Sequence, residues 1–137
     1  DVAPSRGLGD VYKRQDIPKE AVMVYADGDR MYRVFQNLIG NALKYSLEGS
    51  RIYISLKTEK NAAVADIRNT SRSELKQDVD FTARFTRGDE SRTDGGSGLG
   101  LSIAKSFTEA CGGTFEVETM ADLFTVKVSF EQKKCNV

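Results

Sequence analysis

Residues 29–46, DRMYRVFQNLIGNALKYS, are the most strongly patterned stretch of this 137-residue sequence. Their apolar residues recur every three or four positions, the spacing that places side chains on one face of an α-helix. The stripe comprises Met31, Val34, Phe35, Leu38, Ile39, Ala42 and Leu43. Asp29 stands at the start, where an aspartate can accept hydrogen bonds from the first free backbone amides. The pattern predicts an amphipathic helix over residues 29–46, with Asp29 as its N-cap.

The polar face of this helix carries an unusual line of side chains. Asn37, Asn41 and Lys44 follow one another at spacings of four and three, so they stack along one line, with Tyr45 beside them. Asparagine costs about 0.7 kcal/mol relative to alanine inside a helix, so two of them one turn apart indicate a use for their amides. An amide oxygen is a hard ligand suited to magnesium, and a lysine one turn further on can meet a phosphate. A solvated polar face is the simpler alternative.

Residues 96–105, GSGLGLSIAK, form a second informative run, in which three alternating glycines lead directly into another apolar-periodic helix. Glycine lets backbone N–H groups approach an anion closely, and a helix start adds its unpaired amides and the positive end of its dipole. The spacing fits neither the dinucleotide fingerprint nor the P-loop. The run therefore indicates a phosphate site of another kind, with a flexible linker as the alternative.

Together these two segments resemble the N box and the G2 box of the ATP-binding domain of two-component sensor histidine kinases, members of the GHKL superfamily. Residues 37–46 match the family pattern Asn-Leu-Leu-x-Asn-Ala-x-Lys-Tyr-Ser/Thr, and residues 96–101 match its Gly-x-Gly-Leu-Gly-Leu loop. Between them, residues 81–92, FTARFTRGDESR, resemble the F box that leads into an ATP lid. Three motifs in this order are far more specific than any one, and the resemblance runs from about Ile17 to Phe130.

One motif departs from the family pattern. The G1 box ends a strand with Asp-x-Gly-x-Gly, whose aspartate accepts a hydrogen bond from adenine, whereas here a predicted strand over residues 64–67 runs into Arg68-Asn69-Thr70-Ser71. We place Asn69 at the aspartate position. Its oxygen can accept the same bond without a charge, and charged acceptors make bonds about twice as strong. Its N–H₂ group would also suit the guanine carbonyl. We therefore expect weaker adenine binding and looser base selectivity.

The resemblance implies an α/β fold, an α+β two-layer sandwich in which helices cover one face of a mixed, mainly antiparallel sheet, the Bergerat ATP-binding fold. Alternating apolar residues predict strands around residues 52–56, 115–117 and 124–130, and an apolar run predicts a short strand over residues 21–26. A second helix is predicted from about Ser97 to Cys111, ended by Gly112-Gly113. Its inward residues are expected to be Leu99, Ile103, Phe107 and Ala110.

Length and composition predict one domain sized for a single core, and the resemblance implies that residues 16–131 form the catalytic and ATP-binding domain. Residues 1–15 lack a helical period and are expected to be a disordered or foreign tail, and residues 132–137 a C-terminal tail. Twenty basic and twenty acidic residues give a net charge of zero, so nothing predicts a nucleic acid or an anionic membrane surface as partner. No apolar run approaches the ~20 residues needed to cross a bilayer, so we expect no direct membrane insertion.

The resemblance also implies ATP and Mg²⁺ as cofactors, with a role for each matching residue. Asn41 and Asn37 would hold the magnesium, Lys44 would neutralise phosphate, Tyr45 would pack on the nucleotide and Asn69 would meet the base. The glycine loop, with Gly96, Gly98, Leu99, Gly100 and Leu101, would cradle the phosphates. Asn37 and Lys44 are the expected catalytic residues. Arg87 and Arg92 in the lid would contact the γ-phosphate, and a solvated charge cluster is an equal alternative for them.

The sequence contains no histidine, so the phosphoryl acceptor of such a kinase is missing from it. The resemblance therefore implies the catalytic domain of a protein-histidine kinase. We expect it to transfer the γ-phosphoryl group of MgATP to a histidine on a dimerisation domain outside this sequence, which passes it to a response regulator. We further expect a cytoplasmic domain of a parent anchored in the bacterial plasma membrane.

Two alternatives remain open at this point. GHKL-type ATPases carry a glutamate one turn before the magnesium asparagine, where it activates water. The corresponding residue here is Asn37, which is a poor base. The other alternative is a degenerate docking module that has lost its nucleotide through the altered G1 box.

Overall fold

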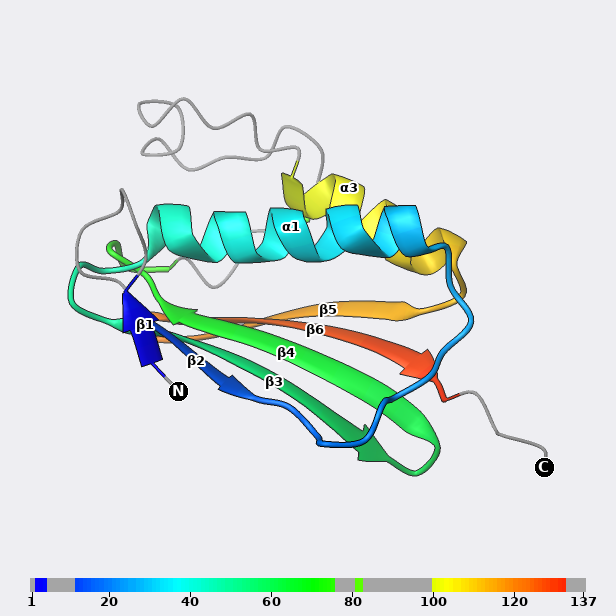
Figure 1. The fold of residues 1–137 in the computed structure, drawn as a ribbon. Helices are drawn as coiled ribbons and strands as arrows, with labels where there is room; N and C mark the ends of the chain where they lie inside the picture. Colours follow the sequence, from blue (N-terminus) through cyan, green and yellow to red (C-terminus); the bar gives the residue numbers. More distant parts are fainter. Residues whose placement is uncertain (1, 5–11, 76–80, 83–99, 133–137) are drawn as a thin grey trace.

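A computed structural model describes residues 2–4, 12–75, 81–82 and 100–132 of the chain. Within these ranges, six strands form one sheet in the order β1-β2-β3-β4-β6-β5, and helices α1 and α3 cover one of its faces (Figure 1). The elements in chain order are β1 (Val2–Pro4), β2 (Tyr12–Asp16), α1 (Gly28–Tyr45), β3 (Arg51–Glu59), β4 (Ala62–Thr70), α3 (Gly100–Ala110), β5 (Thr114–Met120) and β6 (Leu123–Glu131). Strands β2 and β3 pair in parallel, and the other neighbouring strands are antiparallel. The predicted two-layer fold is confirmed.

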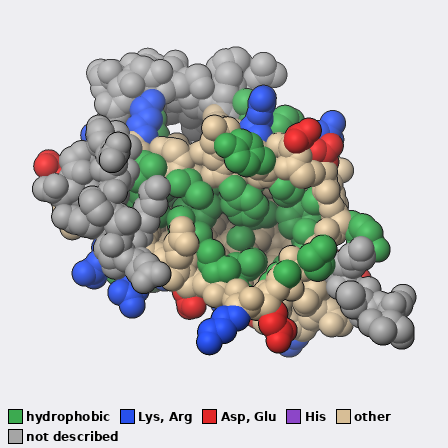
Figure 2. All heavy atoms as spheres, viewed as in Figure 1, with side chains coloured by type: hydrophobic (Ala, Val, Ile, Leu, Met, Phe, Trp, Pro, Cys, Tyr) green, Lys and Arg blue, Asp and Glu red, His purple; other side chains and the backbone are tan. Residues whose placement is uncertain are grey.

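The core lies between the helices and the sheet. Strand side chains alternate between the two faces, so Ile67 and Asn69 of β4 are buried under the helices while Arg68 between them is exposed on the other face. The buried apolar residues are Val34, Leu38 and Ala42 of α1, Leu101 and Ala104 of α3, and Ile52, Ile67, Phe115, Phe124, Val126 and Val128 of the sheet. Other apolar side chains pack around this core and are visible between α1 and the sheet in Figure 2.

Helix α1 confirms the predicted apolar stripe but begins earlier than predicted. Its N-cap is Asp27, whose side chain accepts a hydrogen bond from the backbone amide of Arg30 at 3.1 Å. Asp29, the predicted N-cap, lies instead in the first turn of the helix. The prediction was wrong because two aspartates stand two residues apart, and only the extended backbone of Asp27, φ −71° and ψ 117°, has the geometry of a cap.

Helix α3 buries a different line of residues from the one predicted. Leu101, Ala104 and Thr108 are buried, Phe107 and Ile103 are partly buried, and Ala110 is exposed, so the expectation of an inward Ala110 is wrong. The small side chain of Ala104, which is 0% exposed, lets α3 pack closely. The predicted inward Leu99 lies outside the described residues.

The glycine stop after α3 is confirmed in detail. The amide of Gly113 donates to the carbonyl of Thr108 at 2.9 Å, and the amide of Gly112 donates to that of Glu109 at 3.0 Å. This pair of bonds is a Schellman motif, which needs the left-handed backbone that Gly112 adopts at φ 84°. Gly113 has a different reason to be glycine, since a Cβ there would lie 2.6 Å from the ring of Phe130.

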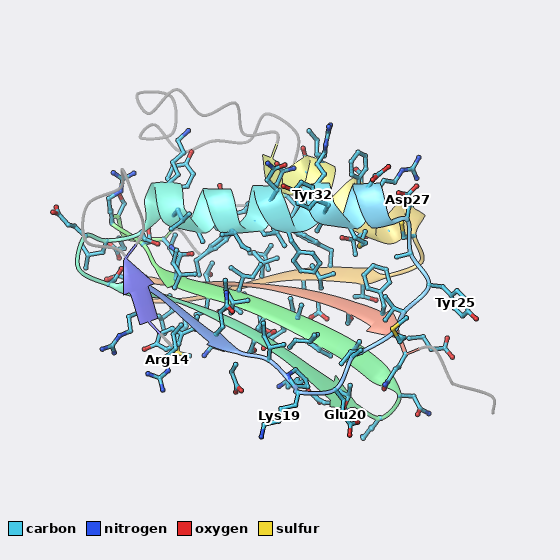
Figure 3. The ribbon with its side chains drawn as sticks, in the orientation of Figure 1. Arg14, Lys19, Glu20, Tyr25, Asp27 and Tyr32 are labelled. Carbon is cyan, nitrogen blue, oxygen red and sulfur yellow. The ribbon has the colours of Figure 1, made fainter. Side chains whose placement is uncertain are left out.

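The N-terminal segment differs from the prediction in two places. Residues 12–16 form β2 in the sheet and residues 2–4 form β1 beside it, so these strands contradict the expectation of disorder over residues 1–15. Residues 21–26 do not form the predicted strand and make one isolated bridge, between Val24 and Gln132. The segment leaves the sheet to reach the start of α1, which exposes Tyr25 by 72% (Figure 3).

Candidate functional site

The polar line of α1 lies on the side of the helix that faces α3. The Arg30 guanidinium lies 5.7 Å from the centroid of the Phe107 ring in α3. Asn37, Asn41 and Lys44 follow Arg30 at spacings of seven, four and three, which keeps all four on one side of the helix. Phe107 is near the end of α3 and Arg30 is in the first turn of α1, so α3 runs back along the first half of α1 and begins near the middle of that helix (Figure 1). Asn37, Asn41 and Lys44 are half-buried, so they remain accessible.

The C-terminal end of α1 is bonded to the end of β4, and we call this contact of residues 44–47 with residues 70–72 the α1–β4 junction. The Leu47 amide donates to the Thr70 carbonyl at 2.8 Å, and Ser46 and Ser71 form an isolated antiparallel bridge. The Arg72 amide donates to the Tyr45 carbonyl at 3.0 Å. Sequence reasoning missed this junction because it depends on backbone pairing between distant segments. It fixes Asn69 relative to the polar line of α1.

Asn69 is a buried amide at the helix-facing side of the sheet. It is 4% exposed, and its strand partner is Phe124 of β6. The Phe124 ring meets the Phe81 ring edge to face, with centroids 5.3 Å apart. Strand β4 extends to Thr70, beyond the predicted residues 64–67, so Asn69 is held by the sheet and not by a loop. A polar side chain with aromatic neighbours is a suitable environment for a flat heterocyclic base.

The side chains at the end of α1 bring positive charge to the junction. The Lys44 Nζ lies 5.4 Å from the centroid of the neighbouring Tyr45 ring, a cation–π distance. The guanidinium of Arg72 donates through Nη2 to the Lys44 carbonyl at 2.7 Å. Sequence reasoning did not single out Arg72, and its position directly after the altered G1 box was the one signal that pointed to it.

The start of α3 supplies the remaining described part of the site. The helix begins at Gly100, followed by the buried Leu101, and its first turn contains no acidic residue that would neutralise the positive end of its dipole. The other predicted residues of the glycine loop and lid, Arg87, Arg92, Gly96, Gly98 and Leu99, lie outside the described residues. The structure therefore joins the end of α1, with Lys44 and Tyr45, to the end of the strand that carries Asn69, while Asn37 and Asn41 precede them on α1 and Gly100 and Leu101 begin α3.

A metal bound in this part of the molecule would need amide or phosphate oxygen ligands. Within the described ranges, no group of three or more His, Cys, Asp or Glu residues is arranged to hold a metal ion. Asn37 and Asn41 offer neutral oxygens one turn apart, a donor set that suits a magnesium ion already bound to phosphates. The residues present therefore fit a metal that arrives with a nucleotide.

The described residues on the opposite face of the sheet form an ion pair and a hydrogen bond. Lys127 of β6 and Glu118 of β5 form a salt bridge, with Nζ and Oε1 3.2 Å apart. The hydrogen bond that Lys127 donates to the Glu118 carboxylate, reinforced by the negative charge of Glu118, raises the pKa of Lys127 above its ordinary value of 10.5. On the same face the Arg68 Nε donates to the Thr125 Oγ1 at 3.1 Å. None of the helices in the described parts of the chain has the length and hydropathy of a membrane span.

Comparison with known proteins gives a consistent family assignment. Residues 26–133 match the model of the histidine kinase-, DNA gyrase B- and HSP90-like ATPase family. The sensor histidine kinase WalK of Bacillus subtilis strain 168 is 36% identical over 104 residues, which cover 72% of this chain and 17% of WalK. The sensor histidine kinase HprS of Escherichia coli K12 is 38% identical over 92 residues, 66% of this chain and 20% of HprS. The chain thus spans about a fifth of the length of these relatives.

Solved structures agree on the fold. The mycobacterial sensor histidine kinase MprB superposes with a TM-score of 0.72 at 22% identity, over 90% of this chain and 84% of that chain. Full-length ShkA in complex with AMPPNP superposes with a TM-score of 0.74 at 18% identity, over 93% of this chain and 27% of that chain.

Proposed function

The chain belongs to the histidine kinase-, DNA gyrase B- and HSP90-like ATPase family, and from that premise we propose that it is a sensor kinase's catalytic domain. It binds MgATP between α1, β4 and α3 and directs the γ-phosphoryl group to a histidine on a separate dimerisation domain. The observation that carries this proposal is the α1–β4 junction, because it holds the buried Asn69 beside the polar line of Asn37, Asn41 and Lys44. ShkA, which has this fold, is described in complex with an ATP analogue.

Each described residue of the site has a role that its chemistry supports. Asn41 and Asn37, which lie one turn apart, would ligate the magnesium through their amide oxygens. Lys44 would offset negative charge on the phosphates, and Tyr45 would pack against the nucleotide. The amides at the start of α3, from Gly100 and Leu101, would donate to phosphate oxygens. Bound ATP supplies the phosphoryl group, and the protein's contribution is to position it and to stabilise charge.

Arg87, Arg92, Gly96, Gly98 and Leu99 complete this proposal as lid and loop contacts of the phosphates. They are assigned by the motifs alone, because the described residues stop short of them. The partner domains are assigned on the same basis. They are a dimerisation domain that carries the acceptor histidine and a response regulator that receives the phosphoryl group from it. We place the domain in the cytoplasm, as part of a parent anchored in the plasma membrane.

Phosphotransfer is favoured over the other two functions by specific residues. An ATPase of this fold would need a base for water one turn before Asn41, where this chain has the amide of Asn37. A docking module without nucleotide would have no need for two half-buried asparagines and a lysine along one side of α1.

Transfer to a histidine tests the proposal directly. The chain is mixed with the separately produced dimerisation domain of its parent kinase and γ-labelled MgATP, and acid-labile label on that domain is measured. We expect transfer by the wild-type chain and its loss in Asn41→Ala, whereas Gln36→Ala, an exposed position of the same helix, retains it. Steady release of phosphate without any acceptor would support the ATPase instead.

The base preference of the site depends on Asn69. A neutral amide can accept from the adenine amino group or, when rotated, donate to the guanine carbonyl, whereas a carboxylate can only accept. We expect the wild-type chain to discriminate weakly between ATP and GTP analogues. Asn69→Asp should raise the ATP-to-GTP affinity ratio about tenfold, since a charged acceptor strengthens one bond and repels the other base. An unchanged ratio would remove Asn69 from the base site.

A further inference from the structure

The last turn of α1 is completed by residues from outside the helix. The final carbonyls of a helix lack intrahelical partners and need donors from elsewhere. Here the Ser46 hydroxyl donates to the Ala42 carbonyl, the Arg72 guanidinium to the Lys44 carbonyl at 2.7 Å, and the Arg72 amide to the Tyr45 carbonyl at 3.0 Å. Arg72 therefore supplies two of these donors, one from its backbone and one from its side chain.

Arg72 also stands at the point where β4 leaves the sheet. It follows Ser71, which bridges Ser46, and the Ser71 hydroxyl accepts from the Ser73 amide at 3.2 Å, so this turn is held by side chains. A guanidinium at the C-terminal end of a helix is further favoured by the negative end of the helix dipole. The Arg72 side chain thus connects the strand that carries Asn69 with the turn that carries Asn41, Lys44 and Tyr45.

We propose that Arg72 is a positioning residue of the nucleotide site, which fixes Lys44 and the last turn of α1 relative to Asn69. This inference rests on the proposed nucleotide site. Arg72 acts through Lys44, since it bonds the backbone carbonyl of that residue and not its ammonium, which lies 5.4 Å from the centroid of the Tyr45 ring. Loss of the guanidinium would leave the Lys44 carbonyl without this donor and loosen the last turn of α1, although its backbone bonds remain, so that nucleotide binding would have to order it. Affinity should then fall without a comparable loss of fold.

The test compares Arg72→Ala with Arg68→Ala in titrations with MgAMPPNP. Arg68 is a suitable control because it is also an arginine of this region, and its side chain donates at 3.1 Å to Thr125 on the opposite face of the sheet. We expect Arg72→Ala to weaken binding about tenfold, the effect of losing one charge-assisted hydrogen bond. Arg68→Ala should stay within about twofold of the wild type. Arg72→Lys, which can still donate to the carbonyl, should recover part of the loss.

A double-mutant cycle separates positioning from a purely structural effect. In a Lys44→Ala background, Arg72→Ala should weaken the affinity less than it does in the wild type, because the part of its effect that passes through the Lys44 side chain is already lost. Equal effects in both backgrounds, or unchanged affinity in Arg72→Ala, would overturn the inference. Thermal unfolding of each variant accompanies the titrations, and a loss of affinity that only tracks a loss of folded protein would also overturn it. Failure of the wild-type chain to bind MgAMPPNP would instead overturn the proposed function.

Discussion

The two faces of the sheet contrast sharply along single strands. In β3 and β4 the residues that face the helices, such as Ile52, Ile67 and Asn69, are buried, while their immediate neighbours Tyr53 and Arg68 are exposed. The helix-facing side carries both the core and the candidate nucleotide site, whereas the open side carries ion pairs and hydrogen bonds near solvent. Adjacent residues should therefore differ widely in their effects on stability and binding.

The largest effect on stability is expected from Ile52→Ala. Ile52 is 0% exposed, and truncation of a fully buried isoleucine costs about 2–5 kcal/mol through lost burial and the remaining cavity. Tyr53→Ala, one residue further on the open face, should cost about 1 kcal/mol or less because Tyr53 is 44% exposed. Denaturant unfolding of both variants measures the difference. Equal losses would contradict the assignment of the two faces.

A smaller effect is expected at the two glycines after α3. Gly113→Ala places a Cβ 2.6 Å from the Phe130 ring, which must move, at a cost of about 1–3 kcal/mol. Gly112→Ala meets no atom but holds an alanine at φ 84°, which costs about 1 kcal/mol. The added variant Phe130→Leu should reduce the cost of Gly113→Ala and leave that of Gly112→Ala unchanged. Rescue of both glycine variants would show that the ring is not the obstacle.

Two buried threonines should respond in opposite directions to loss of their hydroxyl groups. The Thr108 Oγ1 has no hydrogen-bond partner among the described residues, so Thr108→Val should stabilise the fold by about 1 kcal/mol. The Thr125 Oγ1 on the open face accepts from Arg68, so Thr125→Val should destabilise the fold by about 1 kcal/mol. Unfolding midpoints of the two variants provide the measurement. Destabilisation by Thr108→Val would mean that its hydroxyl is bonded after all.

The smallest effect concerns the exposed pair of Lys127 and Glu118. Glu118 raises the pKa of Lys127 in the folded chain, so the pair stabilises the fold at pH values below 10.5. This contribution should be lost as the pH rises through the folded pKa. The free energy of unfolding of the wild type should therefore fall more steeply above pH 10.5 than that of Glu118→Gln. Parallel curves for the two proteins would exclude a contribution from the pair.

Much of this fold could be predicted from the sequence because its signals are local. The apolar stripe of α1, the alternation in β3, β5 and β6 and the glycine stop of α3 each depend on neighbouring residues, and the structure has all of them. The wrong predictions concern segments whose secondary structure depends on tertiary contacts. The pairing of residues 12–16 with β3 depends on a strand that lies far along the chain, and residues 21–26 are apolar without a neighbour to pair with over their length.

The candidate site likewise contains features that the sequence predicts and features that only the structure shows. The polar line of α1 is visible in the sequence because helical spacing alone aligns Asn37, Asn41 and Lys44. The position of Asn69 beside that line, and the bonds from Arg72 to the end of α1, follow from the α1–β4 junction. The sequence does not predict that residues 44–47 pair with residues 70–72, because each segment is short and mixed in polarity.

Calorimetric titration with MgAMPPNP tests the central claim, that the end of α1 is a nucleotide site, most directly. The wild-type chain should bind one equivalent, and omission of magnesium should weaken the binding. Asn41→Ala should lower the affinity at least about tenfold and remove the magnesium dependence, while Gln36→Ala on the exposed side of α1 leaves both unchanged. Absence of binding at millimolar nucleotide, or equal binding by Asn41→Ala and the wild type, would contradict the claim.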